Sequence, residues 1–337
     1  MAAKARRGRD LDFIRDGKRS TWIEVPAGRG KRPVRLPITI VRNGPGPGVL
    51  FTGGNHGDEY EGPIALMKLI RELEPKDLIC GTVVIMPMIN PPAIAAGTRT
   101  SPLDGKNLNR MFPGKARGTV TERIAHTITT EILPHVETVY DLHAGGVASQ
   151  IIPSVMIHKL RSKPLMDRTV AAMRAFRAPV GILIKEFESE GMLDTTVEKM
   201  GKVFGCCELG GAGMSTPETV DVTETGVRNL LIHLGMLKGK LKTPVWMGKR
   251  QTRILEAMSY GCYTHAPAAG IYEPFVALAD RVKKGEPVGQ IHNPKAPGRP
   301  AAVCKAPADG IVFTRHAFGL IKKGQVVVTV AQPSKDY

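Results

Sequence analysis

The stretch GGNHGDEYEGP, residues 53–63, places one histidine and three acidic residues in a turn with glycine at both ends. It follows the apolar run VLFTGG and leads into EGPIALMKLIRELEP, whose apolar residues recur at helical spacing. A strand, a polar turn and a helix in this order are typical of an α/β sheet, in which ligands bind at the carboxyl ends of the strands. The turn is therefore predicted to lie at a binding edge.

The same alternation of strand and helix continues through the first 240 residues and predicts an α/β domain with a largely parallel sheet. LPITIVRN is predicted to pair with VLFTGG as a hairpin across the turn GPGPG, which makes the sheet mixed. A long loop is expected at 91–119. Further strands are expected in TVVIMPMIN, TVYDLHAGG, IIPSVMIH, VGILI and KVFGCCELGG, and helices at 61–75, 119–133, 163–177 and 217–237. The predicted units are a basic N-terminal segment at 1–35, a catalytic domain at 36–245 and a β domain at 250–337.

The C-terminal part carries an internal repeat. APAAGIY at 266–272 matches APADGIV at 306–312, and RVKKGEPVGQI at 281–291 matches LIKKGQVVVTV at 320–330. A duplicated β unit predicts two halves related by a pseudo-two-fold axis. This part resembles the biotinyl/lipoyl carrier barrel, in which a modified lysine lies in a hairpin between the halves. Lys295 holds the corresponding place in HNPKAPGRP, but prolines surround it, so a barrel-sandwich fold without a carrier function is expected.

Composition excludes several classes of function. The chain has 337 residues and a net charge of +16, but only 5% aromatic residues and no nucleic-acid-binding module, so the charge favours anionic small molecules and no specific nucleic acid. No apolar run approaches the ~18 residues needed to span a membrane. The five cysteines contain no CxxC pair, and no secretory signal follows the basic N-terminus. A cytoplasmic protein with reduced cysteines is predicted.

His56 and Glu59 are three residues apart, so one turn of chain can bring an imidazole nitrogen and a carboxylate oxygen to one point. Such a pair alone is common, and a hydrogen-bonded loop histidine is the simpler interpretation. His143, at the end of the strand TVYDLHAGG, changes this weighting, because two histidines and one glutamate form a ligand set of catalytic zinc. Asp141 either orients a histidine ligand or is a solvated carboxylate at the strand end.

A zinc hydrolase also needs a base and a group that polarises the scissile carbonyl. Glu208 ends the apolar strand KVFGCCELGG, where burial would raise its pKa; alternatively it caps the following loop. The carboxylates of Glu186, Glu188 and Glu190 compete for this role from a more polar segment. Arg99 and Arg110 lie in the long loop and can bind carboxylates or an oxyanion, or form surface salt bridges.

Four motifs together resemble the succinylglutamate desuccinylase/aspartoacylase family of zinc carboxypeptidase-like hydrolases, from about residue 36 to the C-terminus. They are GGNHGDEYEGP, NPPAIAAGTRTSPLDGKNLNRMFPG, DLHAGG and ELGG. The resemblance implies a three-layer α/β/α catalytic domain and hydrolysis of a small N-acyl amino acid. The longer stretch between Arg99 and Asn109 disfavours N-acetylaspartate as substrate, and GNHGDEYEGPIAL, SPLDGKNLNR and MGKVFGCCELGG resemble the branch of N-acetyl-diaminobutyrate deacetylases.

The resemblance also implies roles for individual residues. One zinc ion per chain would be held by His56, Glu59 and His143. Glu208 would be the general base and proton shuttle, and Arg99 would polarise the scissile carbonyl. The residues implied to bind the carboxylate of the substrate are Asn109 and Arg110.

Two other functions stay open at this stage. A carboxypeptidase-type metallopeptidase would use the same ligands but needs an open cleft for a peptide. A non-catalytic carrier or binding protein would use the C-terminal β domain and would be modified at Lys295. A homo-oligomer is compatible with either.

Overall fold

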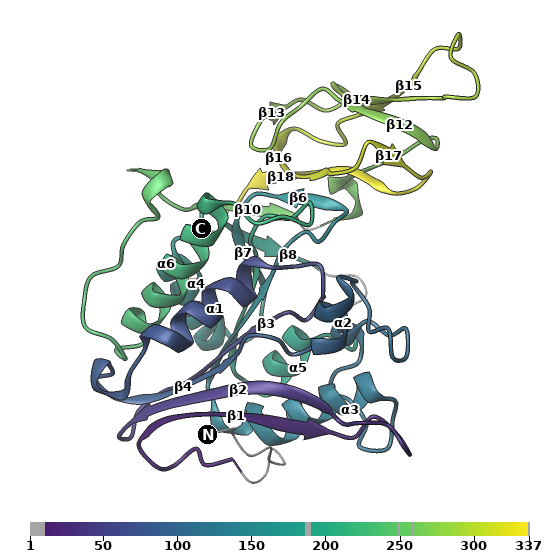
Figure 1. The fold of residues 1–337 in the computed structure, drawn as a ribbon. Coiled ribbons are helices and arrows are strands. Elements are labelled where there is room, and N and C mark those ends of the chain that lie inside the picture. The colour runs from purple at the N-terminus through teal and green to yellow at the C-terminus, as the bar shows by residue number, and fades with distance from the viewer. Residues whose placement is uncertain (1–10, 186–189, 249, 258, 336–337) are drawn as a thin grey trace.

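A long mixed sheet runs through the whole protein (Figure 1). The structure, a computed structural model, describes residues 11–185, 190–248, 250–257 and 259–335. Nine strands form the sheet of the first part in the order β1-β2-β4-β3-β5-β9-β7-β8-β10. Their bounds are β1 (Gly17–Val25), β2 (Val34–Asn43), β3 (Gly48–Gly53), β4 (Gly81–Met86), β5 (Thr138–His143), β7 (Ser154–His158), β8 (Val180–Ile184), β9 (Val203–Glu208) and β10 (Arg253–Ala257).

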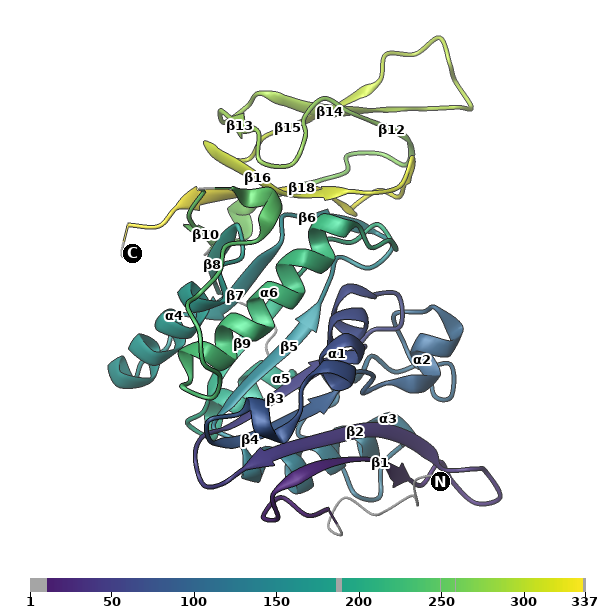
Figure 2. The ribbon, with the colours of Figure 1, turned by 60° about the vertical axis from the view of Figure 1, so that its left-hand side comes forward.

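Helices cover both faces of this sheet and make three layers. One hydrophobic cluster joins one face of the sheet to α1 (Glu61–Glu72), α4 (Lys163–Phe176) and α6 (Pro217–His233). A second cluster joins the other face to α3 (Val120–Thr127) and α5 (Leu193–Lys199). Figure 2 shows α6 in front of the sheet, running along β5 and β9, and α2 (Pro91–Ala96) lies on the side of α3. The predicted mixed α/β architecture is confirmed.

The central strands place the predicted site residues at one edge. Strands β4, β3, β5 and β9 are mutually parallel, so their carboxyl ends lie together. Every residue of β3, β4 and β5 is buried, which fits the apolar runs VLF in β3 and VVIM in β4. The register pairs His143, the last residue of β5, with Glu208, the last residue of β9. Two residues far apart in sequence are thereby neighbours.

The predicted hairpin between LPITIVRN and VLFTGG is wrong. Strand β4 lies between β2 and β3, antiparallel to β2 and parallel to β3. The turn GPGPG does reverse the chain, but β3 does not pair with β2. Strand β4, which follows later in the chain, lies between them. The true hairpin partner of β2 is β1, which pairs with it along its whole length from Gly17 to Val25. The boundary predicted at residue 35 therefore falls inside a hairpin of the sheet; residues 1–10 lie outside the described part.

Several smaller elements differ from the prediction. The segment 91–119, predicted as a loop, contains α2 and the short 3-10 helix η3 (Leu108–Arg110). The helix predicted at 119–133 is an α-helix only to Thr127 and continues as a π-helical turn, Ile128–Ile132. IIPSVMIH divides into β6 (Ser149–Ile151) and β7. In addition, α5 had no counterpart in the prediction.

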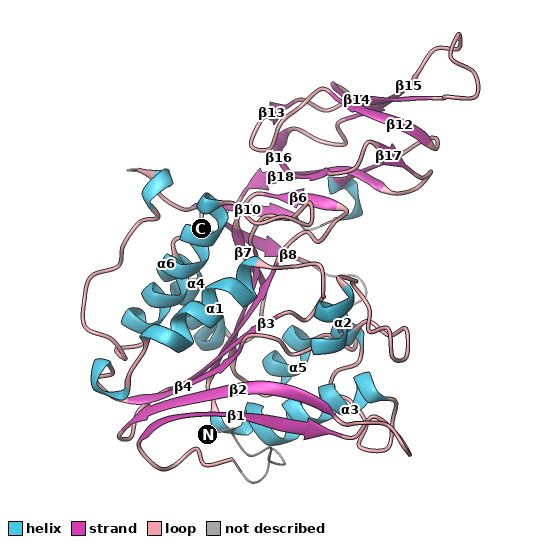
Figure 3. Ribbon diagram, in the orientation of Figure 1, coloured by secondary structure: helices cyan, strands magenta, loops and turns pink. Residues whose placement is uncertain are grey.

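The C-terminal part is built from strands, as Figure 3 shows. Strand β18 pairs with β10, so the long sheet continues into this part as β18-β16-β13, and β15-β14-β12-β17 form a separate sheet. Short side strands complete the pairing: β11 pairs with β18, and β6 pairs with β16. The bounds are β11 (Tyr263–His265), β12 (Gly270–Pro274), β13 (Arg281–Val282), β14 (Pro287–His292), β15 (Ala302–Lys305), β16 (Gly310–His316), β17 (Leu320–Ile321) and β18 (Val326–Pro333).

The internal repeat corresponds to matching strands. Strands β12, β13 and β14 of the first copy correspond to β16, β17 and β18 of the second. Each long strand pairs with the short strand of the other copy, β12 with β17 and β16 with β13. Apolar residues of both copies pack together between the two sheets. This exchange fits the predicted pseudo-two-fold relation, whereas a closed carrier-type barrel remains a prediction. Lys295 lies in the exposed turn between β14 and β15.

Across the described residues, no helix has both the length and the apolar character needed to cross a membrane.

Close packing between α4 and α6 gives a test of the fold. A Cβ atom at Gly226 of α6 would lie 2.1 Å from the ring of Phe176 in α4. We expect Gly226→Ala to lower the free energy of unfolding in urea by about 1–3 kcal/mol, because the core would be overpacked. Phe176→Leu in the same chain should recover part of this loss. The control is Gly298→Ala, whose Cβ would have no atom within 4 Å; an equal loss there would contradict the packing argument.

Candidate active site

The structure brings His56, Glu59 and His143 together at the carboxyl ends of two neighbouring strands. Nδ1 of His56 lies 2.7 Å from Oε1 of Glu59, and Nδ1 of His143 lies 2.8 Å from Oε2 of the same carboxylate. One ligand atom from each of the three residues lies within 4.8 Å of the others. All three side chains are buried, with at most 3% of their surface exposed. Both imidazoles thus aim the same ring nitrogen at one shared point.

Glycine permits this turn by allowing a close backbone approach. A Cβ atom at Gly57 would lie 1.9 Å from the carbonyl oxygen of Ala93 in α2, a distance no side chain can accept. The N–H of Gly57 also donates to the carbonyl oxygen of Thr98. The turn is therefore pressed against α2, and its two ligand residues point toward β5.

Asp141 holds His143 in one orientation. Its Oδ2 lies 2.8 Å from Nε2 of His143, and Thr52 and Asn55 donate to its two oxygens at 2.7 and 3.0 Å. Because an ionised carboxylate can only accept, Nε2 of His143 carries a proton, so Nδ1 is the ring nitrogen that can bind a metal once its own proton is displaced. The structure thus places Asp141 where an orienting carboxylate is needed, buried and not solvated.

Charges at the cluster support one another. Burial alone would raise the pKa of Glu59, but the nearby charges of His143 and His56 lower it. Burial would lower the pKa of His143, yet the charges of Asp141 and Glu59 raise it well above its ordinary value. For His56, burial dominates and the pKa is lowered. Two carboxylates and two imidazoles out of contact with water form a site that favours a cation.

The donor atoms fit zinc. Two imidazole nitrogens and one carboxylate oxygen are a known catalytic zinc set, leaving a position for water or substrate. The Nε2 atoms of both histidines are occupied by other partners, His143 by Asp141 and His56 by Oδ1 of Asn107. Only the Nδ1 atoms therefore face the shared point. Among the residues that the structure describes, this is the one group of three His, Cys, Asp or Glu side chains with metal-ligand spacing.

Glu208 lies beside this cluster, opposite His143 in the register of β5 and β9. Its Oε2 is buried and has no hydrogen-bond partner within the described part of the chain. Burial, followed by the negative charge of Glu59, raises the pKa of Glu208 to about 8. A carboxyl group so perturbed and free of partners is suited to accept and release protons. The competing Glu190 is exposed, and Glu186 and Glu188 lie outside the described residues.

The three predicted residues of the long loop are placed differently from one another. Arg99 lies next to the cluster, with Nη1 3.4 Å from Oε1 of Glu59 and half of its side chain exposed. Asn109 is buried, and its Oδ1 accepts from the N–H of Leu193, so only its Nδ2 could donate to a substrate. Arg110 is exposed and donates to the carbonyl oxygen of Asn109.

A cavity of about 550 Å³ adjoins the cluster at Glu208. Arg110 also lines it, together with residues of the C-terminal strands, including Tyr263 of β11 and Phe313 of β16. Apolar residues of β7 and β8, namely Met156, Ile182 and Ile184, also line it. The predicted base and a predicted carboxylate-binding arginine therefore line one cavity, together with residues of the C-terminal part.

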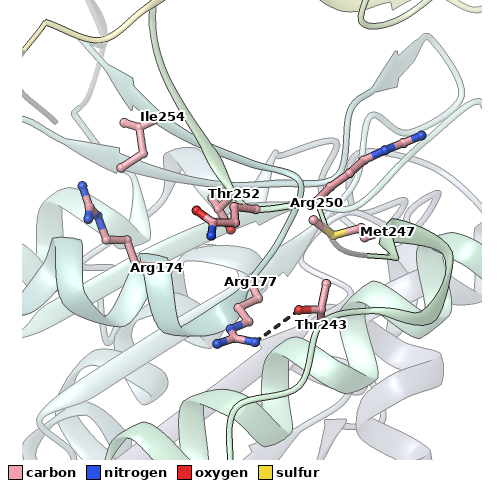
Figure 4. Close-up of a pocket in the computed structure, with 8 residues that line it drawn as sticks. Arg174, Arg177, Thr243, Met247, Arg250, Thr252 and Ile254 are labelled. Carbon is pink, nitrogen blue, oxygen red and sulfur yellow. Dashed lines mark hydrogen bonds between the residues drawn. The ribbon is translucent and has the colours of Figure 1, made fainter.

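A second cavity, of about 460 Å³, contains none of the predicted site residues. It lies at the end of α4 and is lined by Arg174, Arg177 and Arg250. Figure 4 shows that these guanidinium groups do not converge: Arg177 points to Thr243, to which it donates at 3.2 Å, and Arg250 points away. Arg177 thereby anchors the segment that follows α6.

Sequence reasoning missed the supporting hydrogen bonds. Asn107 contacts His56, and Thr52 and Asn55 donate to Asp141. In the sequence, only NLNR and the residues before His56 drew attention to these regions. Asp58 also has a structural role, because its Oδ2 accepts from the N–H of Val147 at 2.9 Å. None of these contacts has a sequence signal of its own.

Together, the mixed sheet and the buried cluster at its carboxyl edge place the chain among α/β enzymes whose active site is built around a candidate metal centre. The family description of the succinylglutamate desuccinylase/aspartoacylase catalytic domain matches residues 45–234, and the chain belongs to that family. This family consists of hydrolases that act on amide bonds. The structure therefore belongs to such a hydrolase.

Relatives match along nearly the whole chain. The N-alpha-acetyl-L-2,4-diaminobutyric acid deacetylase of Halomonas elongata is 38% identical over 325 residues, which are 96% of this chain and 94% of that protein. The product-bound ectoine utilization protein EutE (DoeB) of Ruegeria pomeroyi is 38% identical with a TM-score of 0.91, covering 96% of this chain and 97% of that one. A succinylglutamate desuccinylase/aspartoacylase of Rhodobacter sphaeroides is 36% identical with a TM-score of 0.92, covering 97% and 98%.

The cluster predicts loss of metal when one ligand is removed. We expect His56→Ala to bind no zinc after dialysis, because only two protein ligands, Glu59 and His143, would remain. Zinc content per chain, measured by mass spectrometry of the digested protein, checks this. His292→Ala, at an exposed histidine of β14, is the control and should retain the metal. Full zinc occupancy in His56→Ala would contradict the assignment.

Proposed function

We propose that the protein is a zinc-dependent deacylase that hydrolyses the amide bond of a small N-acyl amino acid, with Nα-acetyl-diaminobutyrate as the first candidate substrate. The observation that carries this proposal is the buried His56–Glu59–His143 group beside Glu208, whose buried Oε2 has no hydrogen-bond partner in the part of the chain that the structure describes. The candidate substrate is taken from the deacetylase of Halomonas elongata, which is similar over nearly the full length.

Each residue of the site has a proposed role. Zinc, when bound, would supply a Lewis acid that activates water and the scissile carbonyl. Glu208 takes a proton from the attacking water and later delivers it to the leaving amine, for which Oε2, without a partner among the described residues, is suited. Arg99 donates to the carbonyl oxygen as negative charge develops there. The carboxylate of the substrate binds Arg110 and Nδ2 of Asn109, near the cavity that Arg110 lines.

The alternatives are less well supported. A carboxypeptidase-type peptidase is less favoured, because the deacetylase of Halomonas elongata, which is similar over nearly the full length, is named for a small N-acetylated compound. A carrier function would use Lys295. This residue lies in the exposed turn between β14 and β15 and is not part of the candidate metal centre. Membership of an amide hydrolase family favours the deacylase.

The proposal is tested by a hydrolysis screen with the zinc-loaded protein. N-acetyl, N-succinyl and N-formyl amino acids, including Nα-acetyl-diaminobutyrate, are compared with short peptides by the release of free amine. We expect cleavage of one N-acyl amino acid class, with a loss of activity on chelation and its return on addition of zinc. Cleavage of peptides alone, or no cleavage of any compound, would sink the proposal.

Glu208→Gln separates the base from the metal ligands. We expect the variant to keep its zinc but to lose roughly 100- to 10,000-fold in kcat, the range that general acid–base catalysis contributes. Zinc content and steady-state kinetics measure the two effects. Glu190→Gln, at an exposed carboxyl that competed for the role in the sequence, serves as the matched control and should behave as the wild type. Unchanged turnover in Glu208→Gln would refute the assigned base.

Arg110→Ala addresses substrate binding. Because charge-assisted hydrogen bonds contribute about 1.5–3 kcal/mol, we expect KM to rise roughly ten- to hundredfold while kcat falls less. Steady-state kinetics with the best substrate of the screen measure this. Arg299→Ala, at an exposed residue of the β14–β15 connection, is the control. A fall in kcat with an unchanged KM would place Arg110 in the chemical step instead.

A further inference from the structure

One side-chain oxygen connects the candidate metal centre to the turn that carries Asn109 and Arg110. Asn107 lies at the N-terminal cap of η3, and its Oδ1 is 3.0 Å from Nε2 of His56 and 2.9 Å from the backbone nitrogen of Asn109. His56 and Asn107 are 51 residues apart in the chain. The contact therefore exists only in the folded protein.

The backbone contact fixes which atom of the Asn107 carboxamide faces the histidine. A backbone N–H can only donate, so the atom of Asn107 that meets Asn109 must be the oxygen. The same oxygen meets Nε2 of His56 and can only accept there. Nε2 of His56 therefore carries a proton, and Nδ1, which faces Glu59, is the nitrogen that can bind a metal once its own proton is displaced. Asn107 thus selects the one tautomer in which His56 can act as a ligand.

The two histidines have different supporting groups. Nε2 of His143 donates to a carboxylate, Asp141, whereas Nε2 of His56 donates to the neutral carboxamide of Asn107. A charged acceptor makes an imidazole a stronger ligand than a neutral one does, because it stabilises positive charge on the ring. His56 is for this reason the weaker of the two supported ligands, and its orientation depends more on geometry than on charge.

Oδ1 of Asn107 also stabilises the turn that carries Asn109 and Arg110. By accepting from Asn109 it caps η3, whose last residue is Arg110. The turn is fixed on its other side as well, since Asn109 accepts from the N–H of Leu193 and the N–H of Phe112 donates to the carbonyl oxygen of Gly191. Movement of the turn would therefore be transmitted to His56 through Asn107.

We propose that Asn107 is a positioning residue that sets the tautomer and orientation of His56 and couples it to the turn of Asn109 and Arg110. The metal-binding half of this inference needs only the metal centre, whereas the coupling to substrate rests on the proposed function. Neither half requires Asn107 to contact the substrate.

The test compares Asn107→Leu, which keeps the size but removes the acceptor, with Asn107→Asp, which keeps an acceptor and adds charge. Affinity for zinc is measured by competition with a chromophoric chelator. We expect a 10- to 100-fold weaker affinity in Asn107→Leu, the usual effect of losing such a supporting partner. Asn107→Asp should bind zinc at least as tightly as the wild type. Wild-type affinity in Asn107→Leu would overturn the proposal.

A spectroscopic measurement separates positioning from a general loss of stability. With Co²⁺ in place of zinc, the visible absorption bands report the ligand geometry directly. We expect altered bands in Asn107→Leu and nearly unchanged bands in Asn107→Asp. The control is Asn43→Leu, because Asn43 donates to the carbonyl oxygen of Leu78 away from the site. Equal changes in the control and in Asn107→Leu would reduce Asn107 to a structural role and overturn the inference.

A substitute variant and a kinetic measurement complete the test. If Asn107→Leu does not fold, Asn107→Ser replaces it, since the shorter hydroxyl cannot span to both partners; the same loss of zinc affinity is expected. In kinetics, the coupling predicts that Asn107→Leu raises KM even when zinc is saturating. A weaker zinc affinity with an unchanged KM would refute the coupling and leave the metal-binding half in place. Failure of the deacylase proposal would instead show as no hydrolysis by the wild type.

Discussion

The carboxylate of Glu59, held between the Nδ1 atoms of His56 and His143, is the interaction on which the rest of the site depends. It exists because β3 and β5 are adjacent and parallel, so that the turn after one strand meets the last residue of the other. Close contact of Gly57 with α2 presses the turn into place. Burial then removes water from the charges, which strengthens their attraction and makes any unpaired group costly.

The residues around the Glu59 carboxylate have separate roles. Asp141 accepts from Nε2 of His143, and Asn107 accepts from Nε2 of His56. The two Nδ1 atoms are therefore oriented before a metal ion binds. Glu208 lies at the end of the next strand, where burial raises its pKa, and its Oε2 has no hydrogen-bond partner among the described residues, so it can exchange protons. The C-terminal strands complete the cavity in which Glu208 and Arg110 lie. This wall comes from the part of the chain that its repeat had marked as a separate β unit.

Sequence reasoning succeeded where a signal was local and failed where a contact was not. Polar residues at the ends of apolar strands sufficed to collect His56, Glu59 and His143, because parallel strands align their ends. The β2–β3 hairpin was wrong because a turn such as GPGPG reveals a reversal but not whether another strand later enters between its arms. Strand β1 was missed because Lys18 and Arg19 made its start resemble a basic tail. Asn107 could not be identified, since its role depends on which nitrogen His56 presents across 51 residues.

The central claim is that the three side chains hold one metal ion through the two Nδ1 atoms and the carboxylate of Glu59. Diffraction data from crystals of the zinc-loaded protein, collected above and below the zinc absorption edge, test it most directly. The account predicts one strong anomalous peak per chain between His56, Glu59 and His143, with Nε2 of His56 still on Asn107. No peak at this position, or a peak approached by the Nε2 atoms, would contradict it.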